Sequence, residues 1–439
     1  MLNVDYTKRV KQIKPMHAVN NGPVGARSEQ TRSNFEEYKA LEVPYARNHD
    51  ASFFSGYGGE HSVDVHAIFP DFNKDPYNPA SYDFQLTDEY TNLIYNAGTK
   101  VFYRLGSKIE HWSKKYGTLV PDDFKKWAVI CEHIIRHYTE GWANGFFLDI
   151  EYWEIWNEPD GKKKNGDQPN WSGTPEQFYE LYKIAARHLK KCFPDKKIGG
   201  PSLSWVDNRE WLEGFMKSLV EDGEKTPLDF FSWHAYPQKT EWPVRDAQIV
   251  RDKLLEYGYT ETENILNEWN YLEGWSDKFI DTIKHIIGIR GAAFAAAMMI
   301  AGQKSPLDMM MYYDARPCTF NGLFDFYTLK PLKGYYSFLM FSKIYKLQNE
   351  VMSHSDDEEI YIVAAEKDAK KAMMITYYSP DKQAEPKKIE MEICGNDVNG
   401  EWNMKILDAE KTMESSEIEV KDNKISFIMY PESVMLLEK

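Results

Sequence analysis

Eight short apolar segments alternate with longer helix-like segments up to about residue 340, and this alternation is the feature that most limits the fold. The segments are hydrophobic at consecutive positions, as parallel strands are when both faces are buried. Strands that alternate with helices predict an α/β protein, and eight such units are the number in a (β/α)8 TIM barrel. A doubly wound open sheet has the same alternation, so the count alone leaves that alternative open. The predicted strands are residues 15–20, 43–48, 100–106, 152–157, 197–202, 229–236, 264–269 and 307–313, and the clearest helices are 31–42, 122–141, 175–192, 208–223 and 276–302.

The chain after residue 340 follows a different pattern. Short runs of alternating character at residues 360–366, 372–379, 388–394, 401–407 and 425–431 are separated by clusters of Asp, Asn, Gly, Lys and Pro. Regularly spaced short strands with turn signals between them predict an all-β sandwich. We therefore expect a catalytic barrel over residues 13–340 and a C-terminal β-sandwich over residues 341–439.

Charge and cysteine content exclude several classes of function. Lys and Arg number 53 against 68 Asp and Glu, a net charge of −15, so nucleic acid and anionic membranes are poor partners. The four cysteines form no CxxC pair that would indicate a zinc site. The first residues lack the apolar core of a signal peptide, and the longest apolar run, residues 291–302, is too short to cross a bilayer. The sequence as it stands predicts a cytoplasmic protein, although a secretory signal removed beforehand would leave the same start.

Two glutamates follow predicted strands on opposite sides of the barrel. Glu158 ends the fourth strand in WNEPD, and Glu268 ends the seventh in NEWN. Active sites of TIM barrels lie at these carboxyl ends, so the two carboxylates should face each other across the barrel mouth. Glycoside hydrolysis needs such a pair, because one group protonates the departing oxygen while the other attacks carbon or activates water.

The surroundings of the two glutamates suggest different roles. We expect apolar and aromatic neighbours to keep Glu158 protonated, as a general acid requires. We expect Glu268 to stay ionised with the help of hydrogen bonds from Tyr236 or Arg47. A separation of about 5–5.5 Å between the carboxyl groups would indicate a retaining mechanism, and about 6.5–9.5 Å an inverting one.

The motifs EIWNEPD, Arg47-x-His49 and SWHAYP, together with the late Glu268 and the C-terminal β-domain, carry a resemblance over nearly the whole chain. The chain resembles the clan A retaining glycoside hydrolases, and within them most closely glycoside hydrolase family 39, which contains β-xylosidases and α-L-iduronidases. It departs from the β-xylosidase pattern at ARNHD, where a His-Gly pair is usual, and at the eighth strand, which ends in Tyr313 and Asp314 without a Trp. These departures leave the identity of the sugar open.

The resemblance implies that Glu158 is the acid/base and Glu268 the nucleophile, with Asn157 bound to the sugar 2-hydroxyl. It also implies that residues 1–12 add a strand to the β-domain, and it admits a homo-oligomer. Three Trp residues that closely follow or end predicted strands could stack on a sugar face. The full set of expected sugar contacts is Asn157, His49, His234, Tyr236, Arg47, Trp205, Trp269, Trp275 and Tyr313.

The sequence therefore predicts a glycosidase that acts on an oligosaccharide or polysaccharide without a cofactor. The pair His133 and His137 lies within a predicted helix without the glutamate of an HExxH motif, so we expect no metal site there. A β-xylosidase is the leading hypothesis for plant-type glycans. The alternatives are a β-galactosidase, an α-L-arabinosidase or a uronidase on the same scaffold, or a carbohydrate-binding barrel without catalysis.

Overall fold

The computed structural model describes residues 1–26, 31–49, 63–163 and 165–439. At its centre, eight parallel strands form a closed barrel in which each strand pairs with the next along the chain and the last pairs with the first. This confirms the predicted TIM barrel and excludes the open sheet. Each predicted strand coincides with an observed one to within a few residues. The barrel strands are β2 (Ala18–Asn20), β3 (Tyr45–Asn48), β4 (Lys100–Leu105), β5 (Tyr152–Ile155), β6 (Lys197–Leu203), β7 (Phe230–Ala235), β8 (Glu263–Trp269) and β9 (Met309–Tyr312).

Helices surround the barrel, and several of them begin or end at capping residues that can be recognised in the sequence. Thr174 caps α5 in a capping box with Gln177, and Pro175 occupies the first helical turn, where its missing N–H costs nothing. Gly141 ends α4 in the left-handed conformation that glycine adopts most easily. The helical elements are α1 (Phe35–Ala40), α2 (Val65–Ile68), η2 (Pro79–Ser81), α3 (Gln85–Asn96), α4 (Phe124–Glu140), η3 (Trp142–Asn144), α5 (Pro175–Cys192), α6 (Arg209–Ser218), α7 (Glu241–Glu256), α8 (Phe279–Ile286), α9 (Ile289–Lys304) and α10 (Lys333–Lys346).

The prediction of one helix over residues 276–302 is wrong in one respect, because the structure has two helices there. α8 and α9 meet at a bend of 76°. The break falls at Gly288, whose extended backbone makes it the N-cap of α9. Among the described residues, no single helix is long and apolar enough to cross a membrane, and this bent pair alone passes that test of length and composition.

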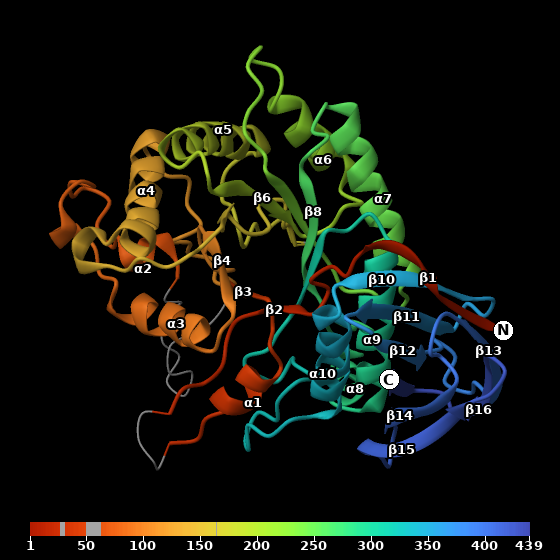
Figure 1. Cartoon of the computed structure of the whole chain (residues 1–439). Helices are drawn as coiled ribbons and strands as arrows, with labels where there is room; N and C mark the ends of the chain where they lie inside the picture. The colour runs from red at the N-terminus through yellow and green to blue at the C-terminus, as the bar shows by residue number, and fades with distance from the viewer. Residues whose placement is uncertain (27–30, 50–62, 164) are drawn as a thin grey trace.

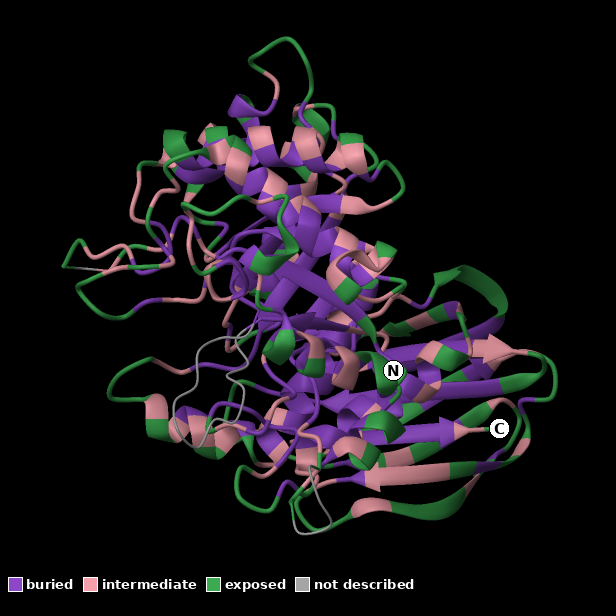
Figure 2. Ribbon diagram, turned by 90° about the vertical axis from the view of Figure 1, so that its left-hand side faces the viewer, coloured by how far each residue is buried: buried purple, intermediate pink, exposed green. Residues whose placement is uncertain are grey.

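The central strands of the barrel are buried (Figure 2), and the side chains inside it change from apolar to polar along its axis. Near the amino ends of the strands, the inward side chains form a small apolar cluster that includes Phe102, Tyr152 and Phe230. Two residues further along β5 and β7, the inward side chains are the fully buried Glu154 and Ser232. Side chains two apart on a strand share a face, so this polar layer lies directly above the apolar one and below the barrel mouth.

The second sheet confirms the predicted β-sandwich and contains strands from both ends of the chain. Its order is β15-β14-β17-β12-β11-β10-β1-β13-β16. β1 pairs antiparallel with β10 and parallel with β13. Residue 340 lies within α10, and the first strand after that helix begins at Asn349. The strands are β1 (Leu2–Gln12), β10 (Asn349–Ser355), β11 (Ile360–Lys367), β12 (Lys370–Tyr377), β13 (Lys387–Cys394), β14 (Gly400–Leu407), β15 (Thr412–Val420), β16 (Lys424–Met429) and β17 (Ser433–Glu438).

The sheet is joined to the barrel through strands that are buried on both faces. In β12, Met373 and Ile375 point into the core of the sandwich, while Ala372 and Met374 belong to the core that continues into the barrel. The same alternation occurs in β11 and β17. α9 and α10 therefore lie between the barrel and the sheet (Figure 1).

Candidate active site

A β-bulge in β8 places two consecutive side chains inside the barrel mouth. The pairing register between β7 and β8 shifts by one residue, so that Asn267 is an extra residue in the ladder. Asn267 donates a hydrogen bond to Glu154 at 2.6 Å, and the next residue, Glu268, contacts Arg47 at 3.3 Å. A bulge of this kind redirects a side chain at the end of a strand.

A second bulge, in β6, supports Glu158. The register between β6 and β7 shifts around Ser202, which has a φ of 61°. The carbonyl of Ser202 accepts a hydrogen bond from the N–H of Glu158 at 2.8 Å. Trp156 and Glu158 also have positive φ values, 78° and 46°. Such conformations are strained for residues with a Cβ atom, and they persist where the surrounding structure fixes them.

The carboxyl group of Glu158 is bound through both of its oxygens. Oε1 lies 2.8 Å from Nδ1 of His234, and Oε2 accepts a hydrogen bond of 2.8 Å from the amide of Asn170. The side chain is 20% exposed. Both carboxylate oxygens of Glu158 thus have polar partners among the described residues, which the sequence alone does not predict.

Glu268 is more deeply buried and has cationic and phenolic partners. The hydroxyl of Tyr236 donates to Oε1, and Arg47 donates to Oε2 at 3.3 Å. The Nε2 atoms of His49 and His234 each lie 3.6 Å from the same Oε2. One oxygen of Glu158, one oxygen of Glu268 and a ring nitrogen of His234 all lie within 4.8 Å of one another.

Burial raises the pKa of Glu268 above its ordinary value. The negative charge of Glu158 adds to the rise, and Arg47 and the Tyr236 hydrogen bond lower the pKa again. The donors that we expected to hold Glu268 ionised are therefore present. They act against a burial penalty that is larger than their effect.

Arg47 forms the centre of a buried hydrogen-bond network below Glu268. Its Nε donates to Glu154 at 2.7 Å, and its Nη2 donates to Asn157 Oδ1 at 2.7 Å and to Ser202 at 3.1 Å. Arg47 and Glu154 are both fully buried, so each charge depends on the other for stability. Because Oδ1 of Asn157 accepts from Arg47, the N–H2 of that amide is the side left to donate.

The family model for glycosyl hydrolases family 39 matches residues 59–415, which is most of the 439-residue chain. The chain belongs to glycosyl hydrolase family 39. The resemblance carried by the NEP motif and the late glutamate is thereby confirmed.

Two curated β-xylosidases are similar to this family 39 chain over part of its length. The protein from Caldicellulosiruptor saccharolyticus is 27% identical over 167 residues, 36% of this chain and 32% of its own. The protein from Geobacillus stearothermophilus is 28% identical over 145 residues, 33% of this chain and 25% of its own. The chain thus spans about a third or less of each relative. A solved glucosidase from Croceicoccus marinus has a TM-score of 0.80 and 21% identity over 100% of this chain and 98% of its own, which shows a shared fold.

Two of the predicted sugar contacts are wrong in this family 39 structure. Trp269 is fully buried, and its ring packs against Phe294 of α9 and against Tyr312. Neighbouring residues on a strand point to opposite faces, so the inward direction of Glu268 turns Trp269 outward into the helix layer. Arg47 is also inaccessible, because it lies below Glu268 and binds protein groups only. It positions the site and cannot contact the sugar.

The other predicted contacts lie at the carboxyl ends of the strands. His49 and His234 are buried beside Glu268, and Tyr313 lies 6.4 Å from the His49 ring, measured between ring centres. Trp275 is 63% exposed, and its ring centre lies 5.3 Å from that of Tyr236. Trp205 is 60% exposed in the loop after β6.

Several residues of the site escaped the sequence analysis. Glu154 lies within a predicted strand and Ser202 ends one, so a polar residue in a mostly apolar segment was the available signal. Asn170 lies in the long loop after β5, and only the fold brings it back to Glu158.

Asp160 accepts two hydrogen bonds from Ser204, and burial raises its pKa to about 6 against the lowering effect of these bonds. A cavity of about 460 Å³ adjoins Pro159 and Asp160.

Two groups of three ligand-type side chains come close together in the described part of the chain. One contains Glu158, His234 and Glu268 themselves, and their atoms already bind Asn170, Tyr236 and Arg47. The other joins α4 to α5 on the outside of the barrel, where an ion pair with Arg136 accounts for the arrangement. Its members are Glu132, His188 and Cys192. A metal ion would have to displace these bonds, so we assign no metal site.

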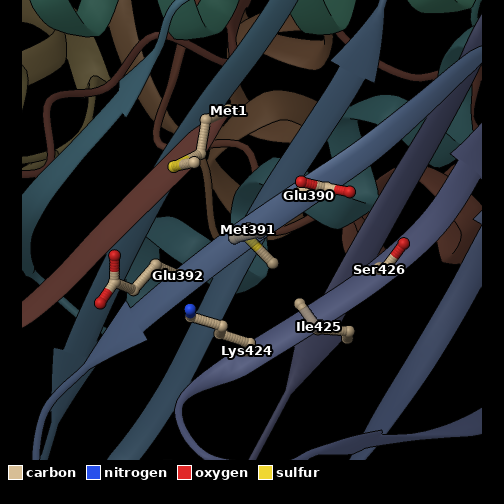
Figure 3. Close-up of a pocket in the computed structure, with 7 residues that line it drawn as sticks. All are labelled: Met1, Glu390, Met391, Glu392, Lys424, Ile425 and Ser426. Atoms are coloured by element: carbon tan, nitrogen blue, oxygen red, sulfur yellow. The ribbon is translucent and has the colours of Figure 1, made fainter.

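A hollow of about 450 Å³ lies on the second sheet between β1, β13 and β16 (Figure 3). No aromatic ring is among the described residues that line it, so it offers no surface on which a sugar ring could stack. Its lining residues are Met1, Glu390, Met391, Glu392, Lys424, Ile425 and Ser426. The candidate chemistry of the molecule therefore lies at the barrel mouth.

Proposed function

We propose that this family 39 chain is a retaining glycoside hydrolase. The observation that carries the proposal is the pair Glu158 and Glu268, which face each other with oxygens within 4.8 Å and in unlike surroundings. Retaining enzymes hold their two carboxyl groups about 5–5.5 Å apart, and inverting enzymes about 6.5–9.5 Å apart to admit a water molecule. The short spacing supports retention.

In the first step, Glu268 attacks the anomeric carbon while Glu158 gives its proton to the departing glycosidic oxygen. The bond from carbon to that oxygen breaks, and a covalent ester between the sugar and Glu268 forms. In the second step, Glu158 takes a proton from water, the water oxygen attacks the same carbon, and Glu268 leaves as a carboxylate. Two inversions at one carbon give net retention.

The neighbours of the two carboxylates suit these roles. Arg47 and Tyr236 donate to Glu268, which stabilises it as the anion that attacks and later departs. Asn157 precedes Glu158, and Arg47 orients its amide so that the N–H2 is available to a sugar hydroxyl. A hydrogen bond to the 2-hydroxyl that strengthens in the transition state would accelerate both steps.

We propose a β-xyloside as the substrate class. The support is the similarity to two β-xylosidases, and it covers 36% and 33% of this chain. Galactosides, arabinosides, glucosides and glucuronides remain as competing substrates for the assay. The exposed Trp275 beside Tyr236 provides an aromatic face where a bound sugar could stack.

The proposal is tested with nitrophenyl glycosides of xylose, galactose, glucose, arabinose and glucuronic acid. The wild type is compared with Glu158→Ala and Glu268→Ala, and with Glu210→Ala as a control on α6. We expect hydrolysis of the xyloside, full activity in the control, and a loss of at least about 10³-fold in both site variants.

Azide distinguishes the two roles. It should restore turnover of Glu268→Ala with a glycosyl azide of inverted configuration, and of Glu158→Ala with retained configuration. Inverted sugar released by the wild type would overturn the retaining mechanism. A wild type inert on this panel and on xylan digests, with sugar binding intact in Glu268→Ala, would instead favour a non-catalytic carbohydrate-binding barrel.

A further inference from the structure

The buried Arg104 of β4 fixes the protonation of His49. Its Nε donates to Nδ1 of His49 at 3.2 Å, and its Nη2 donates to the His49 carbonyl at 3.2 Å and to Asp64 at 2.7 Å. A guanidinium group has only donors, so Nδ1 of His49 must accept and cannot carry a proton. The proton of a neutral His49 ring therefore lies on Nε2, which is 3.6 Å from Oε2 of Glu268.

Ser202 fixes the opposite arrangement in His234. The Ser202 hydroxyl oxygen already accepts hydrogen bonds from Arg47 at 3.1 Å and from Asn267 at 3.3 Å. These occupy its two lone pairs, so its own proton must go to an acceptor. Nε2 of His234 lies 2.7 Å away, whereas Oδ1 of Asn157 lies 3.5 Å away and already accepts from Arg47. Nε2 of His234 is therefore an acceptor, and its proton lies on Nδ1, 2.8 Å from Glu158.

We propose that Arg104 and Ser202 are positioning residues that hold His49 and His234 as neutral rings in opposite tautomers. Each ring thereby directs its single N–H to a different carboxylate, His49 to Glu268 and His234 to Glu158. The tautomers themselves follow from the hydrogen bonds alone, and only their catalytic consequence rests on the proposed function.

The ring nitrogen of His234 that carries the proton determines which of the two carboxylates faces an N–H donor. Nε2 of His234 also lies 3.6 Å from Oε2 of Glu268, so a proton on that nitrogen would face Glu268 and leave Glu158 with a lone pair opposite it. The hydroxyl of Ser202 prevents this. Glu158, Glu268 and the Ser202 hydroxyl all face the His234 ring.

Nitrogen NMR tests the tautomers without any need for turnover. The full chain is labelled with ¹⁵N-histidine, and long-range ¹H–¹⁵N spectra at pH 7 report which ring nitrogens carry protons. The chain has 11 histidines, and the variants His49→Asn and His234→Asn assign the two rings. We expect a proton on Nε2 of His49 and on Nδ1 of His234. A proton on both nitrogens of either ring, or the reverse tautomers, would overturn the proposal.

Variants with matched controls test the two positioning residues. Ser202→Ala should move the His234 proton toward Nε2. Ser232→Ala removes an equally buried hydroxyl, whose partners among the described residues are Glu154 and the backbone N–H of Ser202, and it should leave the proton on Nδ1. Arg104→Met should release the His49 tautomer, and it is combined with Asp64→Asn so that no buried carboxylate loses its partner. Asp64→Asn alone keeps the bond from Arg104 to His49 and serves as the control. Unchanged tautomers in both test variants would contradict the assignment.

Turnover gives a second readout that a merely structural role would not produce. In Ser202→Ala, Glu158 loses a fixed donor to its anion, so the basic limb of the kcat/KM profile should move about one pH unit higher. Ser232→Ala should keep the limb in place. A uniform loss of activity without a shift would reject the positioning role. If the protein hydrolyses no glycoside while the tautomers are as stated, the proposed function fails and the hydrogen-bond inference stands.

Discussion

At the scale of single residues, Glu158 and Glu268 have the same side chain but differ in how deeply it is buried. Glu158 is 20% exposed and is held by neutral amide and imidazole partners. Glu268 lies deeper, against Arg47 and a phenol, and burial still raises its pKa above the ordinary value. The nucleophile must be ionised to attack, so activity should fall as the pH falls through this raised pKa. The acid limb should therefore begin at a higher pH than an exposed glutamate would give.

Tyr236→Phe tests this balance. The phenol hydrogen bond lowers the pKa of Glu268, so its loss raises the pKa further. A hydrogen bond to a charged group contributes about 1.5–3 kcal/mol, and the acid limb of kcat/KM should accordingly move up by about one pH unit or more. The pH profile of kcat/KM measures this. Tyr327→Phe changes an exposed phenol and should leave the profile unaltered. An acid limb that stays in place in Tyr236→Phe would mean that this bond does not control ionisation.

For the two tryptophans near the end of β8, we expect substitution by alanine to affect stability and substrate binding in opposite ways. Trp269→Ala opens a cavity in the helix layer and should lower the free energy of unfolding by about 3–5 kcal/mol. Trp275→Ala removes an exposed ring and should change that free energy by less than about 0.5 kcal/mol, while raising KM about tenfold if the ring stacks on the sugar. Urea unfolding and steady-state kinetics on both variants check this. An equal loss of stability in both would contradict the assignment of Trp269 alone to the core.

At the scale of elements, the strand ends are packed very closely. The spacing of their backbones, more than side-chain chemistry, determines where the acid/base lies. Gly106 directly follows β4 with a φ of 144°, and a Cβ atom there would lie 2.9 Å from the Cα atom of Trp156. Trp156 is two residues before Glu158 and shares its strained turn. The spacing between adjacent barrel strands at this point therefore sets the position of the acid/base.

Gly106→Ala should displace this turn. We expect a loss of about 2–4 kcal/mol in the free energy of unfolding and at least tenfold in kcat/KM, because both strain and a backbone contact are introduced. Gly98→Ala is the matched control: its φ is 82°, but a Cβ atom there meets nothing within 4 Å. It should cost only about 1 kcal/mol of backbone strain and leave kcat/KM unchanged. Equal effects of the two substitutions on kcat/KM would refute the role of the Trp156 contact.

How far the sequence predicts these elements depends on the range of the interaction. The barrel strands could be predicted because buried parallel strands are continuously apolar, and Glu158 and Glu268 because both end such strands. The bulges at Ser202 and Asn267 could not, since a register shift of one residue has no periodic signal of its own. For the same reason the outward direction of Trp269 was missed. The contact of Asn170 with Glu158 depends on how a long loop folds back, which local patterns do not record.

At the scale of the whole molecule, one strand holds the second sheet together. β1 lies between β10 and β13, so β13 and β16 reach the rest of the sheet through it. Val4 points into the sandwich core and is 1% exposed, whereas Val10 on the same strand is 57% exposed.

Charged substitutions at these two valines test that dependence. Val4→Asp places a charge in the core of the sandwich and should lower the free energy of unfolding by at least about 3 kcal/mol. Val10→Asp should stay within about 0.5 kcal/mol. Thermal unfolding and limited proteolysis between β12 and β13 provide the measurements, with faster cleavage in Val4→Asp. Equal melting temperatures for the two variants would show that the sheet does not depend on β1.

The pairing of β1 with β13 also has a consequence for biosynthesis. Leu2 is made well before its partner Met391, because almost the whole of this sequence lies between the two residues. At about 5–20 residues per second, β1 waits for about 20–80 s with its edge toward β13 unpaired. The barrel can assemble while translation continues, but the sandwich has to close after it. A nascent chain stalled before β13 should therefore carry a folded barrel beside a β1 strand that pairs with β10 on one edge and is unpaired on the other, an aggregation hazard that chaperones would have to cover.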